Sequence, residues 1–516
     1  MDRAQIKKMW IADNGDGTYS NPVLYTDYSD PDVIRTGGDY FMIASSFCNT
    51  PAVPLLHSRD LVNWKVINYV MENIPFPGYE KPRHGCGAWA PAIRCHEGTY
   101  YVFIPLPDEG IAVCRTRDPW GTWSGPELIQ KTAGWIDPCP FWDEDGKAYM
   151  VNAFARSRIG FKSYLFLSPI APDCSGQAED GRFIYDGSNT QPTIEGPKMY
   201  KRNGYYYIFA PAGGVKTGWQ TVLRSRDIYG PYEERVVLRQ GDSPVNGPHQ
   251  GAWVDTPSGE DWFIHFQDVG NGGRIIHLQP MHWEDDWPII GIKGRDGIGE
   301  PVLRYEKPCT GTVCSPDAPE DSDFFEEGKP GLQWQWNANH EEDWYRAEGK
   351  GLKLACVKTQ QTFLCDMPNL LLQKWPAPEF QVTTCLDLKG MKEGDRCGLV
   401  SLGGYYSSLL LSREKNGLHL EQRTGRLGEE DETREELGQW TGDSIYLRMK
   451  VVKERYVSCE ISTDGNEYRE VGSTTEAQPG KWVGVKIGYA AIHEGAGECG
   501  EMRADSFVFE PLGDKG

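Results

Sequence analysis

A glycine followed within three residues by an aromatic residue, and then by apolar residues, recurs five times between residues 38 and 264. The copies begin at Gly38, Gly98, Gly146, Gly204 and Gly259, so they lie 60, 48, 58 and 55 residues apart. Aromatic and β-branched residues after a glycine turn are typical of a strand. Five similar units fit a five-bladed β-propeller, in which each blade is a four-stranded sheet. A β-sandwich with chance similarity between its strands is the alternative.

A second pattern lies eight to ten residues before each of these glycines. The five positions carry Asp30, Trp89, Asp137, Glu195 and His249. Each is followed within two residues by proline or glycine, which can kink a strand and present the side chain before it. Equivalent positions of a propeller lie in a ring around its axis. If these segments form the innermost strands, three acids, one tryptophan and one histidine converge on one end of the central channel.

Three converging carboxylates repel one another, so under partial burial one is expected to have a raised pKa while another stays ionised. Glycoside hydrolysis requires such a pair, because a protonated acid must reach the leaving oxygen and an ionised carboxylate must act on the opposite side. A nearby tryptophan can stack on the apolar face of a sugar. A ring of polar residues that only holds water or an ion in the channel is the alternative.

The charge of the chain excludes some partners. Lys and Arg number 53 and Asp and Glu 74, which gives a formal net charge of -21. Nucleic acid and anionic membranes are therefore not expected as partners, because both attract a cationic surface, whereas a neutral sugar is compatible with this charge. No apolar run reaches the roughly 18 residues of a membrane helix, and the opening residues MDRAQIKKMW have no apolar core, so a cytoplasmic location is expected.

The chain of 516 residues is long enough for two to four domains at about 150 residues each. A propeller over residues 1–308 would be followed by a Pro-rich, acidic linker over 309–322. Residues 323–516 contain alternating apolar and polar runs, for example at 380–386 and 446–451, which predict a β-sandwich. The expected fold class is therefore all-β: a five-bladed β-propeller followed by a β-sandwich.

At the five ring positions and the segments around them, the sequence resembles glycoside hydrolase family 43. The resemblance covers residues 15 to 305 almost continuously, and its matching segments are 21–24, 30–35, 45–47, 57–64, 89–91, 135–138, 194–197 and Gly273-Arg274 followed by Trp283. The C-terminal part resembles, more weakly, the jelly-roll, concanavalin A-like sandwich of β-xylosidase-type members.

The resemblance implies an inverting, exo-acting glycosidase that releases terminal α-L-arabinofuranosyl or β-D-xylosyl residues from plant cell-wall glycans or their oligosaccharides. It marks Asp30 as the general base that activates water and Glu195 as the general acid that protonates the leaving oxygen. Asp137 would be the third carboxylate, which holds Glu195 in place and modulates its pKa.

The resemblance also implies secondary roles for five residues, each with a structural alternative. Phe47 and Trp89 would be walls of the sugar pocket rather than core aromatics. Arg274 would bind sugar hydroxyls near the base rather than form a structural ion pair. His249 would line the pocket or sit beside a hydrated calcium ion in the channel, or hold only water. Trp482 would reach the pocket from the sandwich.

The resemblance implies no required cofactor, and a structural calcium ion in the propeller channel is compatible with it. The expected partners are arabinoxylan, xylo-oligosaccharides or arabinan side chains, and a homo-oligomer is compatible with the resemblance. The loop Cys48-Asn49-Thr50-Pro51 departs from the aromatic-rich version of familiar β-xylosidase members, which leaves the preference for xylose or arabinofuranose open. Two alternatives to this function are a non-catalytic sugar-binding propeller and a five-bladed glycosidase that acts on other sugars.

Overall fold

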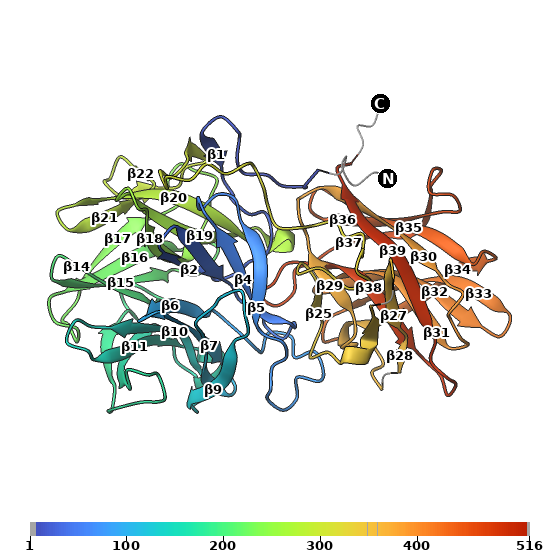
Figure 1. The fold of residues 1–516 in the computed structure, drawn as a ribbon, viewed down its shortest axis with the longest axis horizontal. Helices are drawn as coiled ribbons and strands as arrows, with labels where there is room; N and C mark the ends of the chain where they lie inside the picture. Colours follow the sequence, from blue (N-terminus) through green and yellow to red (C-terminus); the bar gives the residue numbers. More distant parts are fainter. Residues whose placement is uncertain (1–6, 348, 359, 513–516) are drawn as a thin grey trace.

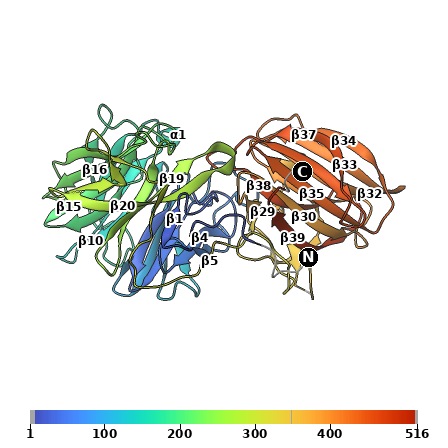
Figure 2. The same ribbon diagram turned by 90° about the horizontal axis from the view of Figure 1, so that it is seen from above.

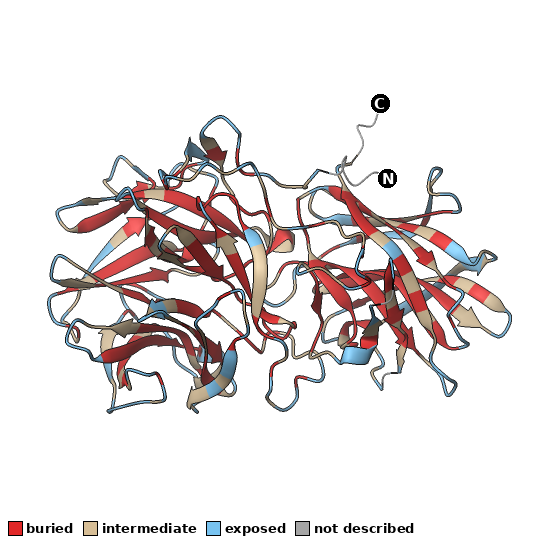
Figure 3. Ribbon diagram, viewed as in Figure 1, coloured by how far each residue is buried: buried red, intermediate tan, exposed pale blue. Residues whose placement is uncertain are grey.

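The computed structural model describes residues 7–347, 349–358 and 360–512 as two β-domains that lie side by side in both views (Figures 1 and 2). Buried residues fill the strands of each domain, and exposed residues gather at the turns (Figure 3). In the described part of the chain, none of the helices is long and apolar enough to cross a membrane.

The first domain contains five sheets, and in each of them four antiparallel strands follow one another along the chain. Their first strands are β2 (Asp32–Thr36), β6 (Ala92–His96), β10 (Trp135–Trp142), β14 (Lys198–Arg202) and β18 (His249–Asp255). Their second strands are β3 (Asp39–Ile43), β7 (Thr99–Leu106), β11 (Ala148–Phe154), β15 (Tyr205–Ala212) and β19 (Asp261–Asp268). Their third strands are β4 (Ala52–Ser58), β8 (Gly110–Thr116), β12 (Tyr164–Ile170), β16 (Trp219–Ser225) and β20 (Arg274–Glu284). Their outer strands are β5 (Lys65–Met71), β9 (Ser124–Gln130), β13 (Arg182–Asp186), β17 (Glu233–Leu238) and β21 (Trp287–Ile290).

This arrangement confirms the five-bladed propeller. Each repeated glycine lies in the turn before the second strand of a blade, so the aromatic and apolar residues after it form β3, β7, β11, β15 and β19. The first strands are the inner ones: β18 contacts β2, β2 contacts β6, and β10 contacts both β6 and β14. The residues that precede or begin these strands therefore lie around one axis.

The N-terminal segment joins the first blade to the last. Tyr19 Oη donates a hydrogen bond to the carbonyl of Leu278 in β20 at 2.8 Å, and Leu24 forms a β-bridge with Ile276. The Asn21 side chain donates to the carbonyls of Leu278 and Val302, both at 2.8 Å. Short strands complete the domain: β1 (Thr18–Ser20) pairs with β24 (Arg304–Glu306), while β22 (Ile292–Lys293) and β23 (Gly299–Glu300) extend blade four.

The second domain is a β-sandwich, as expected. One sheet has the order β25 (Gln335–Trp336), β29 (Leu371–Lys374), β38 (Lys486–His493), β31 (Asp395–Leu402), β32 (Tyr405–Glu414), β33 (Gly417–Arg426) and β34 (Thr433–Trp440), with β28 (Val357–Lys358) beside β38. The other has the order β26 (Tyr345–Arg346), β27 (Leu352–Ala355), β39 (Glu501–Glu510), β30 (Phe380–Asp387), β35 (Ser444–Val452), β36 (Tyr456–Ser462) and β37 (Arg469–Glu476). In β30 every second residue is buried in the core between the sheets, which is the alternation that the sequence predicts. Within residues 7–347, 349–358 and 360–512, the short helices are α1 (Arg156–Ile159), η2 (Gly270–Gly272), η3 (Glu342–Trp344) and η4 (Leu364–Asp366).

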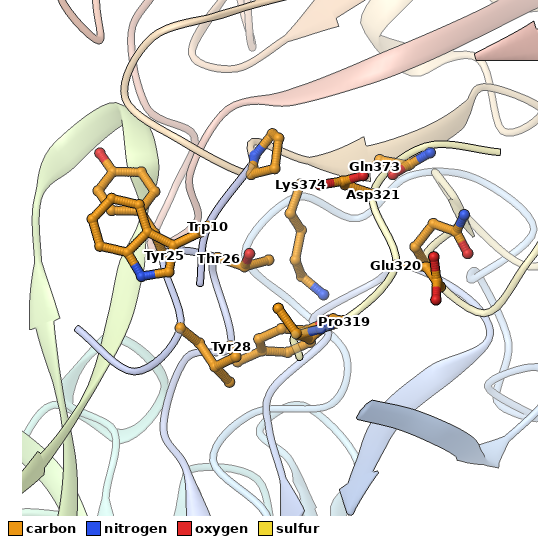
Figure 4. Close-up of a pocket in the computed structure, with 13 residues that line it drawn as sticks. Trp10, Tyr25, Thr26, Tyr28, Pro319, Glu320, Asp321, Gln373 and Lys374 are labelled. Carbon is orange, nitrogen blue, oxygen red and sulfur yellow. The ribbon is translucent and has the colours of Figure 1, made fainter. Parts of the chain in front are cut away.

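Polar contacts close the seam between the domains. The loop after β3 forms a β-bridge from Thr50 to Trp336 of β25. Asn339 of the sandwich exchanges two hydrogen bonds with the backbone of Ile74, both of 2.8 Å. Figure 4 shows a small pocket in the same seam, where the ammonium of Lys374 extends toward Tyr28. Lys374 Nζ lies 4.7 Å from the centre of the Tyr28 ring, and burial lowers the pKa of this lysine to about 8.

Candidate active site

A cavity of about 290 Å³ lies where the first strands of the five blades begin. All eight residues that the sequence marks as candidates line it: Asp30, Phe47, Trp89, Asp137, Glu195, His249, Arg274 and Trp482. The ring predicted from the spacing of the repeat is therefore present, with one residue from each blade. Trp482 comes from the sandwich, so both domains form the wall.

Asp30 is held by donors on both of its oxygens. Its Oδ2 accepts hydrogen bonds from Ser45 Oγ at 2.6 Å and from Ser29 Oγ at 3.0 Å, and its Oδ1 accepts one from Arg274 Nη1 at 2.9 Å. Its φ of 58° is left-handed, a conformation that aspartate adopts more readily than most residues. This backbone turn just before β2 directs the side chain out of the sheet and into the cavity. Three donors therefore surround the Asp30 carboxyl group, whose oxygens accept their hydrogen bonds.

Asp137 and Glu195 form the second acidic group. Asp137 lies at a bulge in β10 with a φ of 54°, and its Oδ2 accepts a hydrogen bond from the Gly196 N–H at 2.8 Å. This bond ties Asp137 to the residue after Glu195. Burial, and after it the negative charge of Glu195, raises the pKa of Asp137 to about 7. One proton is therefore retained at this acidic pair close to neutral pH.

His249 is fully buried beside Glu195. Its Nε2 lies 2.8 Å from Glu195 Oε1, and its Nδ1 has no hydrogen-bond partner among the described residues. Calcium takes six to eight oxygen ligands, and in the described part of the chain no group of three or more His, Cys, Asp or Glu residues is placed to hold a metal ion. The donors around His249 do not fit a directly bound calcium ion. A hydrated calcium near its Nδ1 stays a prediction.

Three aromatic side chains, those of Phe47, Trp89 and Trp482, also line the cavity. Trp89 and Trp482 meet edge to face with ring centres 4.8 Å apart, and Phe47 lies 6.5 Å from Trp482 with nearly parallel rings. Trp482 lies between β37 and β38 of the sandwich and has a φ of 65°. A surface of aromatic rings beside carboxylates suits a ligand with an apolar face and hydroxyl groups.

Comparison with known proteins identifies this arrangement. The family profile described as "Glycosyl hydrolases family 43" matches residues 19–288, and "Beta xylosidase C-terminal Concanavalin A-like domain" matches residues 322–510. The chain belongs to glycosyl hydrolase family 43.

Relatives within the family span both domains. A "Putative beta-xylosidase" of Xylanibacter ruminicola is 38% identical over 94% of this chain and 89% of that protein. A "Non-reducing end alpha-L-arabinofuranosidase BoGH43B" of Bacteroides ovatus is 26% identical over 96% of this chain and 95% of that protein. Among solved structures, the GH43 BlXynB protein of Bacillus licheniformis superposes with a TM-score of 0.83 at 26% identity, over 96% of this chain and all of that one. Family 43 membership makes the protein a glycosidase.

One residue that positions this family 43 site escaped the sequence analysis. Asp27 is buried, and its Oδ1 accepts a hydrogen bond from the Arg274 N–H at 2.9 Å. Its Oδ2 accepts one from the Gly484 N–H at 2.8 Å, two residues after Trp482. One carboxylate therefore fixes the start of β20, which carries Arg274, and the sandwich loop that carries Trp482. Asp27 lies outside the repeat positions, so no spacing pattern pointed to it.

Proposed function

We propose that the protein is an inverting, exo-acting glycosidase that releases terminal β-D-xylosyl or α-L-arabinofuranosyl residues from plant cell-wall oligosaccharides. The observation that carries the proposal is the convergence of Asp30, Asp137 and Glu195, from three different blades, on one cavity. Relatives named for each of the two sugars support both specificities.

In this proposal Glu195 is the general acid and Asp30 the general base. Glu195 protonates the oxygen of the leaving group while Asp30 takes a proton from water, which attacks the anomeric carbon from the opposite face. The C–O bond to the leaving group breaks as the bond to water forms, so the anomeric configuration inverts. Blades one and four supply the two carboxyls, which leaves the cavity between them for sugar and water.

The remaining groups would bind the sugar. Arg274 Nε, Trp89 Nε1 and His249 Nδ1 are buried and have no hydrogen-bond partner in the described part of the chain. A buried polar atom without a partner is costly, and a sugar hydroxyl would satisfy it. Trp482 closes one side of the cavity, which favours an enzyme that removes one terminal residue over one that cleaves within a chain.

Hydrolysis of 4-nitrophenyl β-D-xyloside and 4-nitrophenyl α-L-arabinofuranoside tests the proposal, with Glu195→Gln and Asp30→Asn as variants. We expect the wild type to hydrolyse at least one substrate and Asp30→Asn to lose most of its kcat, because it lacks the base. Glu195→Gln is also assayed on an oligosaccharide of the same terminal sugar, where we expect it to lose most of its kcat, because a sugar leaving group needs the proton that 4-nitrophenolate does not. Proton NMR of the first sugar released then reports the configuration. An unchanged configuration would contradict inversion, and full activity of Glu195→Gln on the oligosaccharide would contradict its role as the acid.

A further inference from the structure

A cluster of aromatic residues on blade three extends from the cavity wall to the protein surface. Phe154, the last residue of β11, lines the cavity. Its ring centre lies 5.0 Å from that of Phe161 and 5.7 Å from that of Phe183. Phe161 follows α1, which Figure 2 labels, and Phe183 lies on the outer strand β13. The pocket that holds the reacting sugar therefore continues into an apolar surface outside it.

The two outer rings are unusually exposed for phenylalanine. Phe183 is 56% exposed and Phe161 is 38% exposed, although each also packs against other aromatic rings of the protein. Tyr164 and Phe166 pack against Phe183 with ring centres 5.6 and 5.1 Å apart. Rings fixed from below lose little conformational freedom when a ligand covers them, and exposed apolar clusters of this kind mark binding surfaces.

This surface lies on the side of the cavity that holds Glu195. Ser163, two residues after Phe161, accepts a hydrogen bond on its Oγ from the Thr193 N–H at 2.9 Å. Its carbonyl accepts another from the Gly187 N–H at 2.8 Å. The loop that carries Phe161 is therefore bonded to the segment that leads into Glu195. A leaving group protonated by Glu195 must depart on this side.

We propose that Phe161 and Phe183 form a second sugar-binding platform, which holds residues of the oligosaccharide beyond the one directly linked to the terminal sugar. The proposal rests on the proposed function, because it takes Glu195 as the acid. The C–H faces of pyranose rings pack on the exposed phenyl rings, and Lys162 and Arg156 at the cavity rim supply donors for hydroxyls. The platform makes the enzyme favour longer oligosaccharides over disaccharides.

The test compares kcat/KM for xylobiose and xylotetraose in the wild type, Phe183→Ala and Phe161→Ala. We expect the ratio of xylotetraose to xylobiose to fall roughly three- to tenfold in each variant, because only the longer chain reaches the platform. Activity on a 4-nitrophenyl glycoside stays unchanged, and Phe183→Tyr, which keeps an aromatic ring, retains the wild-type ratio. Trp120→Ala is the matched control, because Trp120 is 51% exposed but packs on Phe41 and His57 away from the cavity.

Titration of xylobiose and xylotetraose into Glu195→Gln, with and without Phe183→Ala, compares the dissociation constants of the two sugars without turnover. An unchanged preference for xylotetraose in the alanine variants would overturn the platform, and so would equal losses on every substrate. A dimer that Phe183→Ala dissociates, with the ratio unchanged, would assign the surface to contact between copies. Wild-type inactivity on both 4-nitrophenyl glycosides would instead overturn the proposed function, while the titration still decides whether the platform binds sugar.

Discussion

Four of the eight candidate residues have left-handed backbone conformations that residues other than glycine seldom adopt. Their φ angles are 58° at Asp30, 53° at Phe47, 54° at Asp137 and 65° at Trp482. Such conformations cost on the order of 1–3 kcal/mol each and persist where surrounding contacts hold them. Here they turn side chains out of the strands and loops and into one cavity. The site is therefore built at some cost to stability, and the burial of Asp137 adds to that cost.

Asp137→Asn tests the cost of burying this acid. An ordinary aspartate has a pKa near 3.8, but that of Asp137 is raised to about 7. Between these values the folded protein binds a proton that the unfolded chain has released, so the stability contributed by this group is complete below pH 4 and is lost as the pH rises through 7. The asparagine variant does not titrate. We therefore expect its melting temperature relative to the wild type to rise from pH 4 to 7 and then to level off.

Differential scanning fluorimetry across pH 4 to 8 measures this difference. Asp186→Asn, a surface substitution outside the cavity lining, is the control. The melting temperature of this control relative to the wild type should not rise from pH 4 to 7. A flat difference for Asp137→Asn would mean that the buried acid does not hold a proton near neutral pH.

At the scale of elements, the site depends on two segments, one from each domain, that are held in place by hydrogen bonds to each other. The η2 turn before Arg274 and the loop from β37 to β38 are bonded to each other: Asn271 donates to the carbonyl of Ala477 at 3.1 Å and accepts from the Val485 N–H at 2.8 Å. Glu454 accepts a hydrogen bond from the Gly272 N–H at 3.0 Å. Asp27 completes the junction by binding both segments.

Asp27→Asn should weaken this junction. The amide that replaces one carboxylate oxygen is a donor, so it faces one of the two N–H groups and cannot accept its hydrogen bond. We expect kcat/KM to fall by roughly tenfold or more, in line with the loss of a charge-assisted hydrogen bond. Asp323→Asn is the matched control: Asp323 also accepts two backbone N–H bonds, from Phe325 and Gly331, but lies outside the cavity lining. Steady-state kinetics and melting temperatures should show similar destabilisation in both variants but a loss of activity only in Asp27→Asn.

The spacing of the repeat predicts the site residues that lie at repeated positions of the blades, but not those that lie outside the repeat. The ring of Asp30, Trp89, Asp137, Glu195 and His249 was predictable because a repeated unit places equivalent residues at one radius of a propeller. Glu195 could be marked as a site residue, but its hydrogen bond with His249 depends on how neighbouring blades are rotated. Asp27 was missed because its two partners are 247 and 457 residues away in sequence. No local pattern encodes such pairings.

At the scale of the whole molecule, the two domains share a seam that contains buried charge. Lys374 of the sandwich donates a hydrogen bond to Gln335 Oε1 at 3.0 Å and covers the ring of Tyr28 (Figure 4). The negative charge of Asp27 raises the pKa of Lys374 and the positive charge of Lys486 lowers it, but burial has the largest effect. The contribution of Lys374 to the stability of the seam therefore depends on pH.

Lys374→Met should reveal that dependence. The pKa of this lysine falls from 10.5 in the unfolded chain to about 8 in the folded protein, so between these values the unfolded chain binds more protons. Wild-type stability therefore rises from pH 8 to about 10.5, whereas the methionine variant lacks this gain. We expect the melting temperature of the variant relative to the wild type to fall over that range. Lys415→Met, at a side chain that is 86% exposed, is the control, and calorimetric curves that show no such fall would contradict the prediction.

The bond between Asp27 and Gly484 also sets when activity can first arise. During translation Asp27 is synthesised 457 residues before its partner Gly484, which follows Trp482 in the same loop. Chains whose synthesis stops short of this loop can form blades, since each blade uses consecutive residues. They lack the sandwich side of the cavity. The complete cavity can therefore form only after the sandwich loop has been synthesised, and a chain cut before that loop would lack Trp482 and the partner of Asp27.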